Sequence, residues 1–128
     1  MNEEGKSIPA PTPAAPPQGL GLASLEEFKK IALRIGVVVE ASDHPNADRL
    51  LILKVDLGEG APRQMVAGIK GSYAAADLIG KRVVVVANLK PALLRGVESQ
   101  GMVLAGSDGA AVILVSPERP LPPGSTVK

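Results

Sequence analysis

The stretch that decides the fold runs from residue 33 to residue 67 and reads LRIGVVVEASDHPNADRLLILKVDLGEGAPRQMVA. It contains three runs rich in β-branched and aliphatic residues, which are typical of β-strands. Two polar turns containing proline or glycine separate these runs, at residues 42–48 and 58–60. The pattern therefore predicts an antiparallel meander of three strands, at Leu33–Ala41, Leu50–Leu57 and Arg63–Ala67.

The segments on either side complete an all-β barrel. Upstream, Ser24 and Glu27 have the spacing of a capping box, which predicts a short helix at Leu25–Ile31. Its apolar residues, Phe28 among them, recur at helical spacing and predict one buried face. Downstream, the sequence predicts a helical turn at Ala74–Ile79 and then three further strands, at Lys81–Ala87, Gly101–Ala105 and Val112–Val115. The strand Lys81–Ala87 is continuously apolar from Val83 onward, which predicts burial on both of its faces.

Three strands, a short helix and two strands are the element order of the OB-fold, a five-stranded Greek-key barrel. The predicted fold is thus an all-β, five-stranded OB-fold barrel with a short N-terminal helix and a C-terminal hairpin extension. In that extension, Val112–Val115 is apolar on both strand faces. It either plugs one end of the barrel or joins two copies of the chain into a homodimer through residues 103–128, and composition leaves both readings open.

The 128 residues have room for one domain. Residues 1–23 hold five of the 12 prolines without hydrophobic periodicity, which predicts a flexible Pro/Ala-rich linker to something upstream, followed by the domain at 24–128. No apolar segment follows Met1, and the longest apolar run, Val83–Ala87, is too short to cross a bilayer. We therefore expect a cytoplasmic protein with no membrane partner.

Catalytic chemistry finds little support in the sequence. The chain has no cysteine, and its one histidine, His44, precedes a proline in a polar turn, where histidine more often shapes the turn than acts as a base. None of the common nucleotide-binding, metalloprotease or hydrolase motifs occurs. The sequence predicts no enzyme activity, no cofactor and no metal site.

RNA binding is better supported. Residues 61–101 hold six basic residues against two acidic ones, which fits a phosphate-binding surface or, equally, ordinary solvated strand edges. With Phe28 and Tyr73 as the two aromatic residues, base stacking along a single strand is not expected. Lysines and amides around residues 88–102 suit the phosphates and 2′-hydroxyls of folded RNA, although such amides can also bond to their own loop.

Several segments of the chain also resemble a known family, the tRNA-binding domain at the C-terminus of bacterial methionyl-tRNA synthetases and in stand-alone tRNA-binding proteins. The resemblance covers residues 25–128 and rests on these segments: Leu33–Gly36, His44–Leu50, Leu53–Gly58, Asn88–Pro91, Gly96–Met102 and Pro122–Ser125. It implies an OB-fold homodimer that binds tRNA by shape, lacks catalytic activity and raises the tRNA affinity of an attached synthetase.

The resemblance and the basic stretch together predict the following RNA-binding residues: Asn46, Lys54, Lys70, Asn88, Lys90, Arg95, Ser99, Gln100 and Met102. One departure is Ala67-Gly68, where relatives commonly carry serine before the glycine, so one hydroxyl contact is missing. Two alternatives remain open: a related OB-fold homodimer that acts as an export-linked chaperone, and an independent tRNA-binding protein with no synthetase attached.

Overall fold

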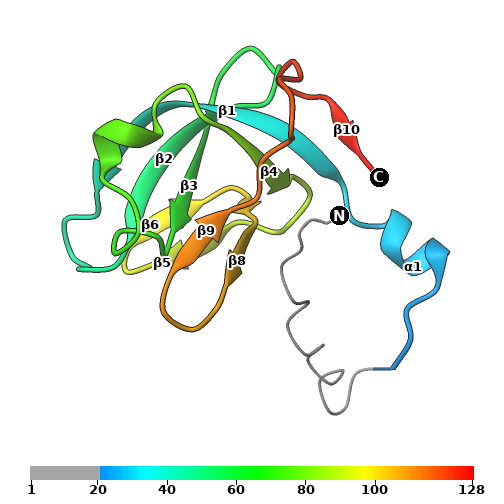
Figure 1. The fold of residues 1–128 in the computed structure, drawn as a ribbon, viewed down its shortest axis with the longest axis horizontal. Coiled ribbons are helices and arrows are strands. Elements are labelled where there is room, and N and C mark those ends of the chain that lie inside the picture. The colour runs from blue at the N-terminus through cyan, green and yellow to red at the C-terminus, as the bar shows by residue number, and fades with distance from the viewer. Residues whose placement is uncertain (1–20) are drawn as a thin grey trace, which may run out of the picture.

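The barrel prediction is confirmed by the computed structural model, which describes residues 21–128. Five strands form an antiparallel sheet in the order β3-β2-β1-β4-β7 (Figure 1). Their bounds are β1 Leu33–Asp43, β2 Leu51–Asp56, β3 Arg63–Ala67, β4 Arg82–Val86 and β7 Met102–Val103. The linker expected at residues 1–23 lies almost wholly outside the described residues.

The two edges of this sheet meet and nearly close the barrel. The Gln100 N–H donates to the Gln64 carbonyl over 2.8 Å, and the Val66 N–H donates to the Ser99 hydroxyl over 3.0 Å. These bonds join β3 to the residues just before β7. The edge strand β3 therefore has hydrogen-bond partners for its backbone groups although it does not pair with β7 as a regular strand.

Alternation of apolar and polar residues explains how the strands face the core. In β2, Leu51, Leu53 and Val55 are buried, while the residues between them are half-buried on the outer face. In β4 both faces are buried, as predicted: Val83 and Val85 join the barrel core, and Val84 and Val86 are buried on the opposite face.

The N-terminal helix agrees with the prediction at its start and differs from it in packing. Helix α1 spans Leu25–Lys29, and Ser24 and Glu27 form the expected capping box with bonds of 2.8 and 3.1 Å. The predicted buried face is wrong, because no residue of α1 is buried and Phe28 is 44% exposed. The helix has only five residues and lies beyond the start of β1, beside the barrel and not against its wall (Figure 1).

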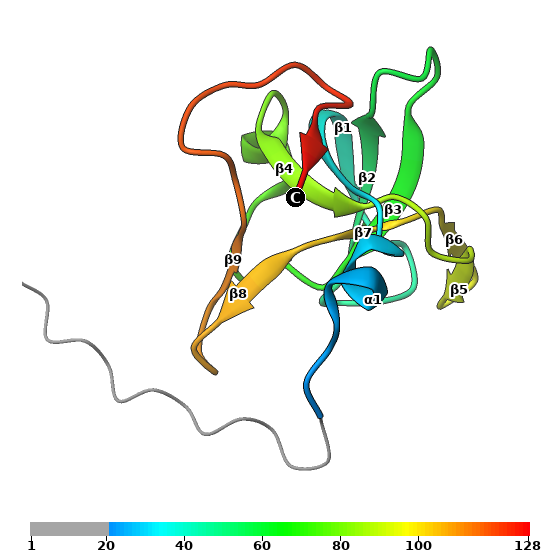
Figure 2. The same cartoon turned by 90° about the vertical axis from the view of Figure 1, so that its right-hand side faces the viewer.

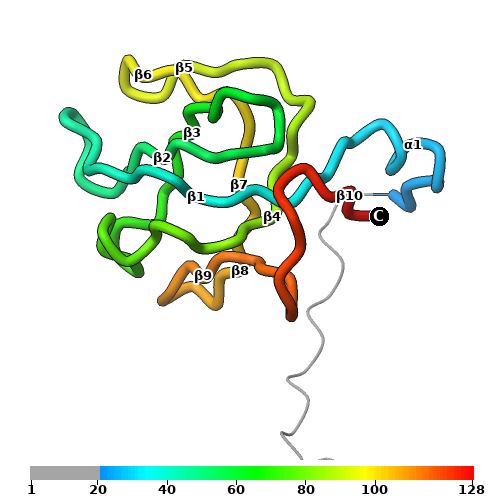
Figure 3. The backbone as a smooth tube through the Cα atoms, turned by 90° about the horizontal axis from the view of Figure 1, so that it is seen from above, coloured from blue at the N-terminus to red at the C-terminus, as the bar shows by residue number. Residues whose placement is uncertain are grey.

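Two hairpins leave the barrel on opposite sides, as Figures 2 and 3 show. The predicted C-terminal hairpin is present as β8 Ala105–Ser107 paired with β9 Val112–Leu114, but the strand expected at Gly101–Ala105 is divided between β7 and β8. The other hairpin, β5 Ala92–Leu94 with β6 Val97–Ser99, was not predicted, since three-residue strands with exposed faces leave no clear alternation in the sequence. The helical turn expected at Ala74–Ile79 is present as a short 3₁₀ helix, η1 Ala75–Leu78.

The C-terminal segment returns across the barrel and ends as β10 Thr126–Val127, paired with the start of β1. Gly124 makes this return possible, because its φ of 90° favours glycine and a Cβ there would lie 2.6 Å from the Leu57 carbonyl oxygen. Ile35 holds the segment by two backbone bonds, of 2.7 Å from the Gly124 N–H and of 2.9 Å to the Ser125 carbonyl.

Candidate nucleic-acid interface

The outer face of β2 and β3 carries the first group of predicted site residues. Lys54 is the register partner of Gln64 on β3 and of Glu40 on β1. Its neighbours in sequence, Leu53 and Val55, point into the core, so Lys54 points outward. Directly opposed residues have Cβ atoms about 5 Å apart, so an ammonium group and an amide stand side by side on this face.

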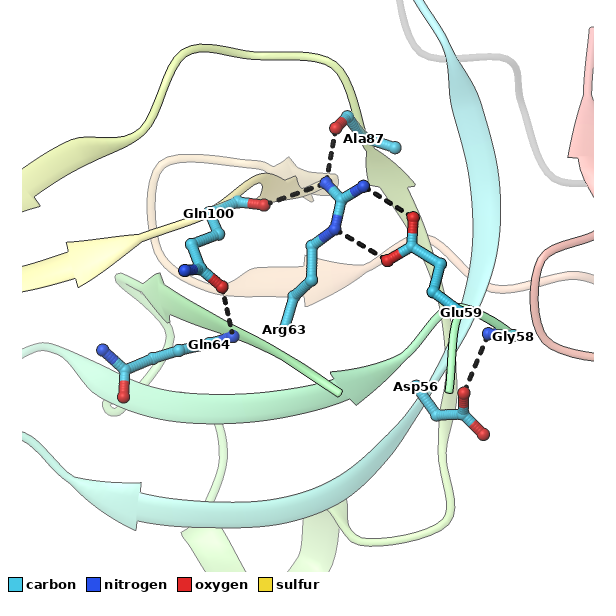
Figure 4. Close-up of polar contacts among 7 residues, drawn as sticks. All are labelled: Asp56, Gly58, Glu59, Arg63, Gln64, Ala87 and Gln100. Carbon is cyan, nitrogen blue, oxygen red and sulfur yellow. Dashed lines mark hydrogen bonds and ion pairs between the residues drawn. The ribbon is translucent and has the colours of Figure 1, made fainter. Parts of the chain in front are cut away.

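Arg63 ties this face to the long connection that follows β4 (Figure 4). Its guanidinium group donates to both oxygens of Glu59, over 2.9 and 2.7 Å, and to the carbonyls of Ala87 and Gln100, over 2.6 and 3.2 Å. Hydrogen bonding to Arg63 is the main cause that lowers the pKa of Glu59. With four bonds made within the fold, Arg63 holds the connection in place and offers little to a ligand.

In the sequence, Arg63 stands out only as one charge of the basic stretch at residues 61–101. The four-residue spacing between Glu59 and Arg63 permits a local ion pair. The carbonyl partners, Ala87 and Gln100, lie 24 and 37 residues further along the chain, so no local pattern in the sequence predicts these bonds. Ala87 and Gln100 bracket the connection, so Arg63 fixes the base of the segment on which Lys90 and Arg95 lie.

Gln100 and Met102 lie on the outer surface as predicted. The Gln100 amide donates to the Glu98 carboxylate over 3.2 Å, and the Gln64 amide donates to the Glu98 carbonyl over 2.9 Å. Met102 is 46% exposed and lines a hollow of about 150 Å³, together with Lys90, Leu89, Ala92 and Leu94. An apolar hollow beside a lysine suits one unstacked base or another apolar group.

Ser99 and Asn88 have structural roles that the sequence did not reveal. Ser99 is buried, and its hydroxyl accepts from the Val66 N–H and donates to the Gly101 carbonyl over 2.8 Å, so both bonds are made within the fold, and a contact of Ser99 with RNA stays a prediction. The exposed Asn88 amide accepts from the Ala32 N–H over 2.8 Å and donates to the Lys30 carbonyl over 2.6 Å. Asn88 thus ties the residues after α1 to the end of β4.

Lys70 and Asn46 lie around the turn between β1 and β2. The Lys70 ammonium is 3.4 Å from the Asp43 carboxylate, so its charge is partly compensated. Lys70 and Asp43 line a hollow of about 570 Å³ together with Tyr73. The Tyr73 hydroxyl accepts a hydrogen bond from the Leu114 N–H over 3.0 Å. Asn46 is exposed in the same turn.

His44 shapes this turn, as its position before Pro45 led us to expect. Its ring is buried; Nδ1 accepts from the Asn46 N–H over 2.9 Å, and Nε2 lies 3.0 Å from the Leu94 carbonyl oxygen. Leu94 is the last residue of β5, so His44 joins the β1–β2 turn to the β5–β6 hairpin. The two segments lie on the same side of the barrel (Figure 3).

Within residues 21–128 no group of three or more histidines, cysteines and acidic residues is placed to hold a metal ion. No helix in this range is long and apolar enough to span a membrane. The barrel with its outer face of lysines, an exposed arginine and amides defines the class of the protein, an OB-fold binding domain.

Comparison with known proteins gives the family. The family model described as "Putative tRNA binding domain" matches residues 33–126, and the chain belongs to this family, which confirms the resemblance stated above. Methionine–tRNA ligase of Pyrococcus furiosus is 52% identical over 111 residues, which are 87% of this chain and 15% of that protein. The ligase of Deinococcus radiodurans is 50% identical over 119 residues, 92% of this chain and 17% of that protein.

Two solved structures have a similar fold. The MetRS-related protein of Pyrococcus horikoshii has a TM-score of 0.78 and 33% identity, with coverage of 85% of this chain and all of the other. The chaperone CsaA of Bacillus anthracis has a TM-score of 0.77 and 34% identity, with coverage of 84% and 100%. The chain thus spans a small part of the ligases and corresponds to a non-catalytic tRNA-binding module.

Proposed function

We propose that the chain binds folded tRNA through one surface, the tRNA face, and that it raises the tRNA affinity of a methionyl-tRNA synthetase to which it is attached. The tRNA face comprises Asn46, Lys54, Lys70, Lys90, Arg95, Gln100 and Met102, with Ser99 and Asn88 supporting it from behind. One observation carries the proposal: within residues 21–128 the side chains of Lys54, Lys90 and Arg95 form no ion pair, so their charges are available to phosphates.

Recognition of RNA shape is favoured over stacking on single strands. Tyr73 uses its hydroxyl to hold β9, and Phe28 lies on α1, which is beside the barrel and away from the hairpin β5–β6 (Figure 3). The tRNA face thus offers charges, amides and one methionine, and no row of aromatic rings. Such groups bind the phosphates and 2′-hydroxyls that a folded RNA displays in a fixed arrangement.

A filter-binding competition tests this function. The protein should bind folded tRNA better than unstructured RNA of equal length, and affinity should fall steeply with salt. Lys90→Ala should weaken binding to all tRNAs and reduce the salt slope by about 0.7–1, because one phosphate contact is lost. Lys81→Ala is the matched control, since Lys81 is an exposed lysine outside both the tRNA face and residues 103–128 and the same charge is removed. Equal affinity for the unstructured RNA would refute shape recognition.

Chaperone activity is the second candidate, favoured by the apolar residues around the Met102 hollow. Leu89, Leu94 and Met102 line this hollow, are all exposed and would suit an unfolded peptide. In that case the chain should slow the aggregation of a denatured protein, and Lys90→Ala should not affect this activity. An independent tRNA-binding protein, as the size of the MetRS-related structure suggests, would bind tRNA without synthetase domains.

Assembly and location complete the proposal. A homodimer through residues 103–128 is supported by the apolar side chains exposed there, Ile113, Val115 and Leu121. Leu25, Phe28 and Ile31 add apolar surface on and beside α1. The β8–β9 hairpin lies across the barrel from the β5–β6 hairpin, so a partner on β8–β9 leaves the tRNA face open (Figure 3). The cytoplasm is the location that fits a tRNA ligand.

A further inference from the structure

Two loops from distant parts of the sequence meet at one hollow. The β1–β2 turn and the tip of the β5–β6 hairpin enclose a hollow of about 400 Å³, lined by Ala47, Asp48, Arg49, Leu50 and Arg95. Arg49 and Arg95 are both exposed. Among the described residues, neither guanidinium group forms an ion pair, so two arginines share the hollow with a single carboxylate, that of Asp48.

Arg95 has a backbone conformation that residues other than glycine, asparagine and aspartate rarely adopt. Leu94 pairs with Val97, so Arg95 and Gly96 form a two-residue hairpin loop. Their φ angles are 53° and 86°, the left-handed pair of a type I′ turn, which favours Asn-Gly. Arg95 is the one non-glycine residue of the range 21–128 with a positive φ. The conformation is strained for such a residue, and strain of this kind is typical of functional positions.

His44 joins the two loops that carry the arginines. Nδ1 must be the acceptor of the Asn46 N–H, so the ring proton lies on Nε2 and is donated to the Leu94 carbonyl. Leu94 directly precedes Arg95, and Asn46 lies three residues before Arg49. The buried ring therefore bridges the two loops immediately beside the hollow, and both bonds depend on this one tautomer.

We propose that Arg49 and Arg95 bind one backbone phosphate of the tRNA, with His44 as the positioning residue that holds their loops together. This subsite rests on the tRNA-binding function proposed above. Guanidinium groups match the oxygens of a phosphate with paired hydrogen bonds. The Asp48 carboxylate only accepts hydrogen bonds, and its partner is the 2′-hydroxyl of the same ribose-phosphate unit. The subsite therefore favours RNA over DNA.

Arg95→Asn separates a binding role from a structural one. It should lower tRNA affinity several-fold and the salt slope by about 0.7–1, because a phosphate contact is lost. It should also raise the thermal midpoint, because asparagine suits the turn. The double variant Arg49→Gln/Arg95→Asn should lose less than the sum of the two single effects, as expected of groups sharing one phosphate. Asp48→Ala should lower the ratio of RNA to DNA affinity for a hairpin of the same sequence.

A matched pair of substitutions tests His44. In His44→Gln the side-chain amide can reach the position of Nε2 and donate to Leu94, whereas His44→Asn can replace only the Nδ1 acceptor. His44→Gln should retain most of the tRNA affinity, and His44→Asn should lose about as much as Arg95→Asn, with both variants folded by circular dichroism. Equal effects of the two substitutions would overturn the role of His44.

The subsite and the broader function fail in different ways. If the parent protein binds tRNA and Lys90→Ala weakens that binding, while Arg95→Asn keeps the parent affinity and salt slope, the subsite is refuted and the function stands. If the parent protein shows no preference for tRNA, both proposals are overturned. Lys81→Gln is the control for the loss of one positive charge, because the exposed Lys81 does not line the hollow and lies outside residues 103–128.

Discussion

Ser99 forms two hydrogen bonds with one hydroxyl group inside the barrel, to Val66 and to Gly101. Ser99→Ala would leave the backbone N–H of Val66, which is itself buried, without a partner. An unsatisfied buried donor costs about 1–3 kcal/mol, so we expect a loss of that size in the free energy of unfolding. Urea denaturation measures it.

The exposed Ser42, on β1, provides the control for this substitution, and Ser42→Ala should change stability by less than about 0.5 kcal/mol. If Ser99→Ala were as stable as the parent protein and yet bound tRNA weakly, the hydroxyl would belong to the tRNA face after all.

Single residues also show how far the sequence predicted the site. The role of His44 was predicted correctly, because a histidine before a proline in a short polar turn has local partners. Ser99 and Asn88 were recognised as polar groups near the ligand face. The sequence did not show that their hydrogen bonds are made within the fold, since their partners Val66 and Ala32 lie far away along the chain. Arg49 was missed because it belongs to no basic run.

Among the elements, the connection between β4 and β7 depends on the pair formed by Arg63 and Glu59. The pKa of Glu59 is lowered in the folded protein, so the pair stabilises the fold above the usual carboxyl pKa and loses this effect as pH falls through the lowered value. Because the pair is partly exposed, the gain should be below about 1 kcal/mol.

Glu59→Gln should therefore reduce the urea midpoint at pH 7 and make little difference at pH 2–3. The comparison of the two proteins at both pH values is the measurement. Glu118→Gln is the control, since its pair with Arg119 is 4.0 Å long and almost fully exposed. A deficit of Glu59→Gln that persisted unchanged in acid would contradict the assignment.

The elements that were predicted well share a physical property. The five barrel strands bury one or both faces, so hydrophobic alternation or continuity marks them in the sequence. The β5–β6 hairpin and the packing of α1 lack such a signal. In the hairpin, β5 is exposed throughout and the one buried residue of β6 is the polar Ser99. The apolar residues of α1 repeat at helical spacing although the barrel does not cover them.

At the scale of the whole molecule, the unburied apolar surface predicts a dimer. Ile113 is 54% exposed on β9, whereas Leu114 belongs to the core, so Ile113→Glu addresses the interface without unfolding the barrel. Full burial of one such side chain contributes about 1.5–3 kcal/mol, so a few of them per subunit offset the cost of association.

Analytical ultracentrifugation should show a dimer for the parent protein and a monomer for Ile113→Glu, with lower tRNA affinity for the monomer. Ile79→Glu, at a residue that is 56% exposed outside residues 103–128, should remain dimeric. A parent protein that stays monomeric at high micromolar concentration would exclude this assembly and favour the plug reading of the hairpin.

The pairing of β10 with the start of β1 places residue 33 next to residue 127, so the entrance and the exit of the barrel are neighbours. The β1–β2 turn and the hollow with Arg49 and Arg95 lie at the other end of β1, away from α1 and the C-terminus (Figure 1). A protein joined at either end would therefore leave the hollow uncovered. Such a barrel can be fused to another protein at either end without losing its binding surface. In a fusion of this kind, the length of the linker sets the effective concentration of the bound tRNA at the fused protein.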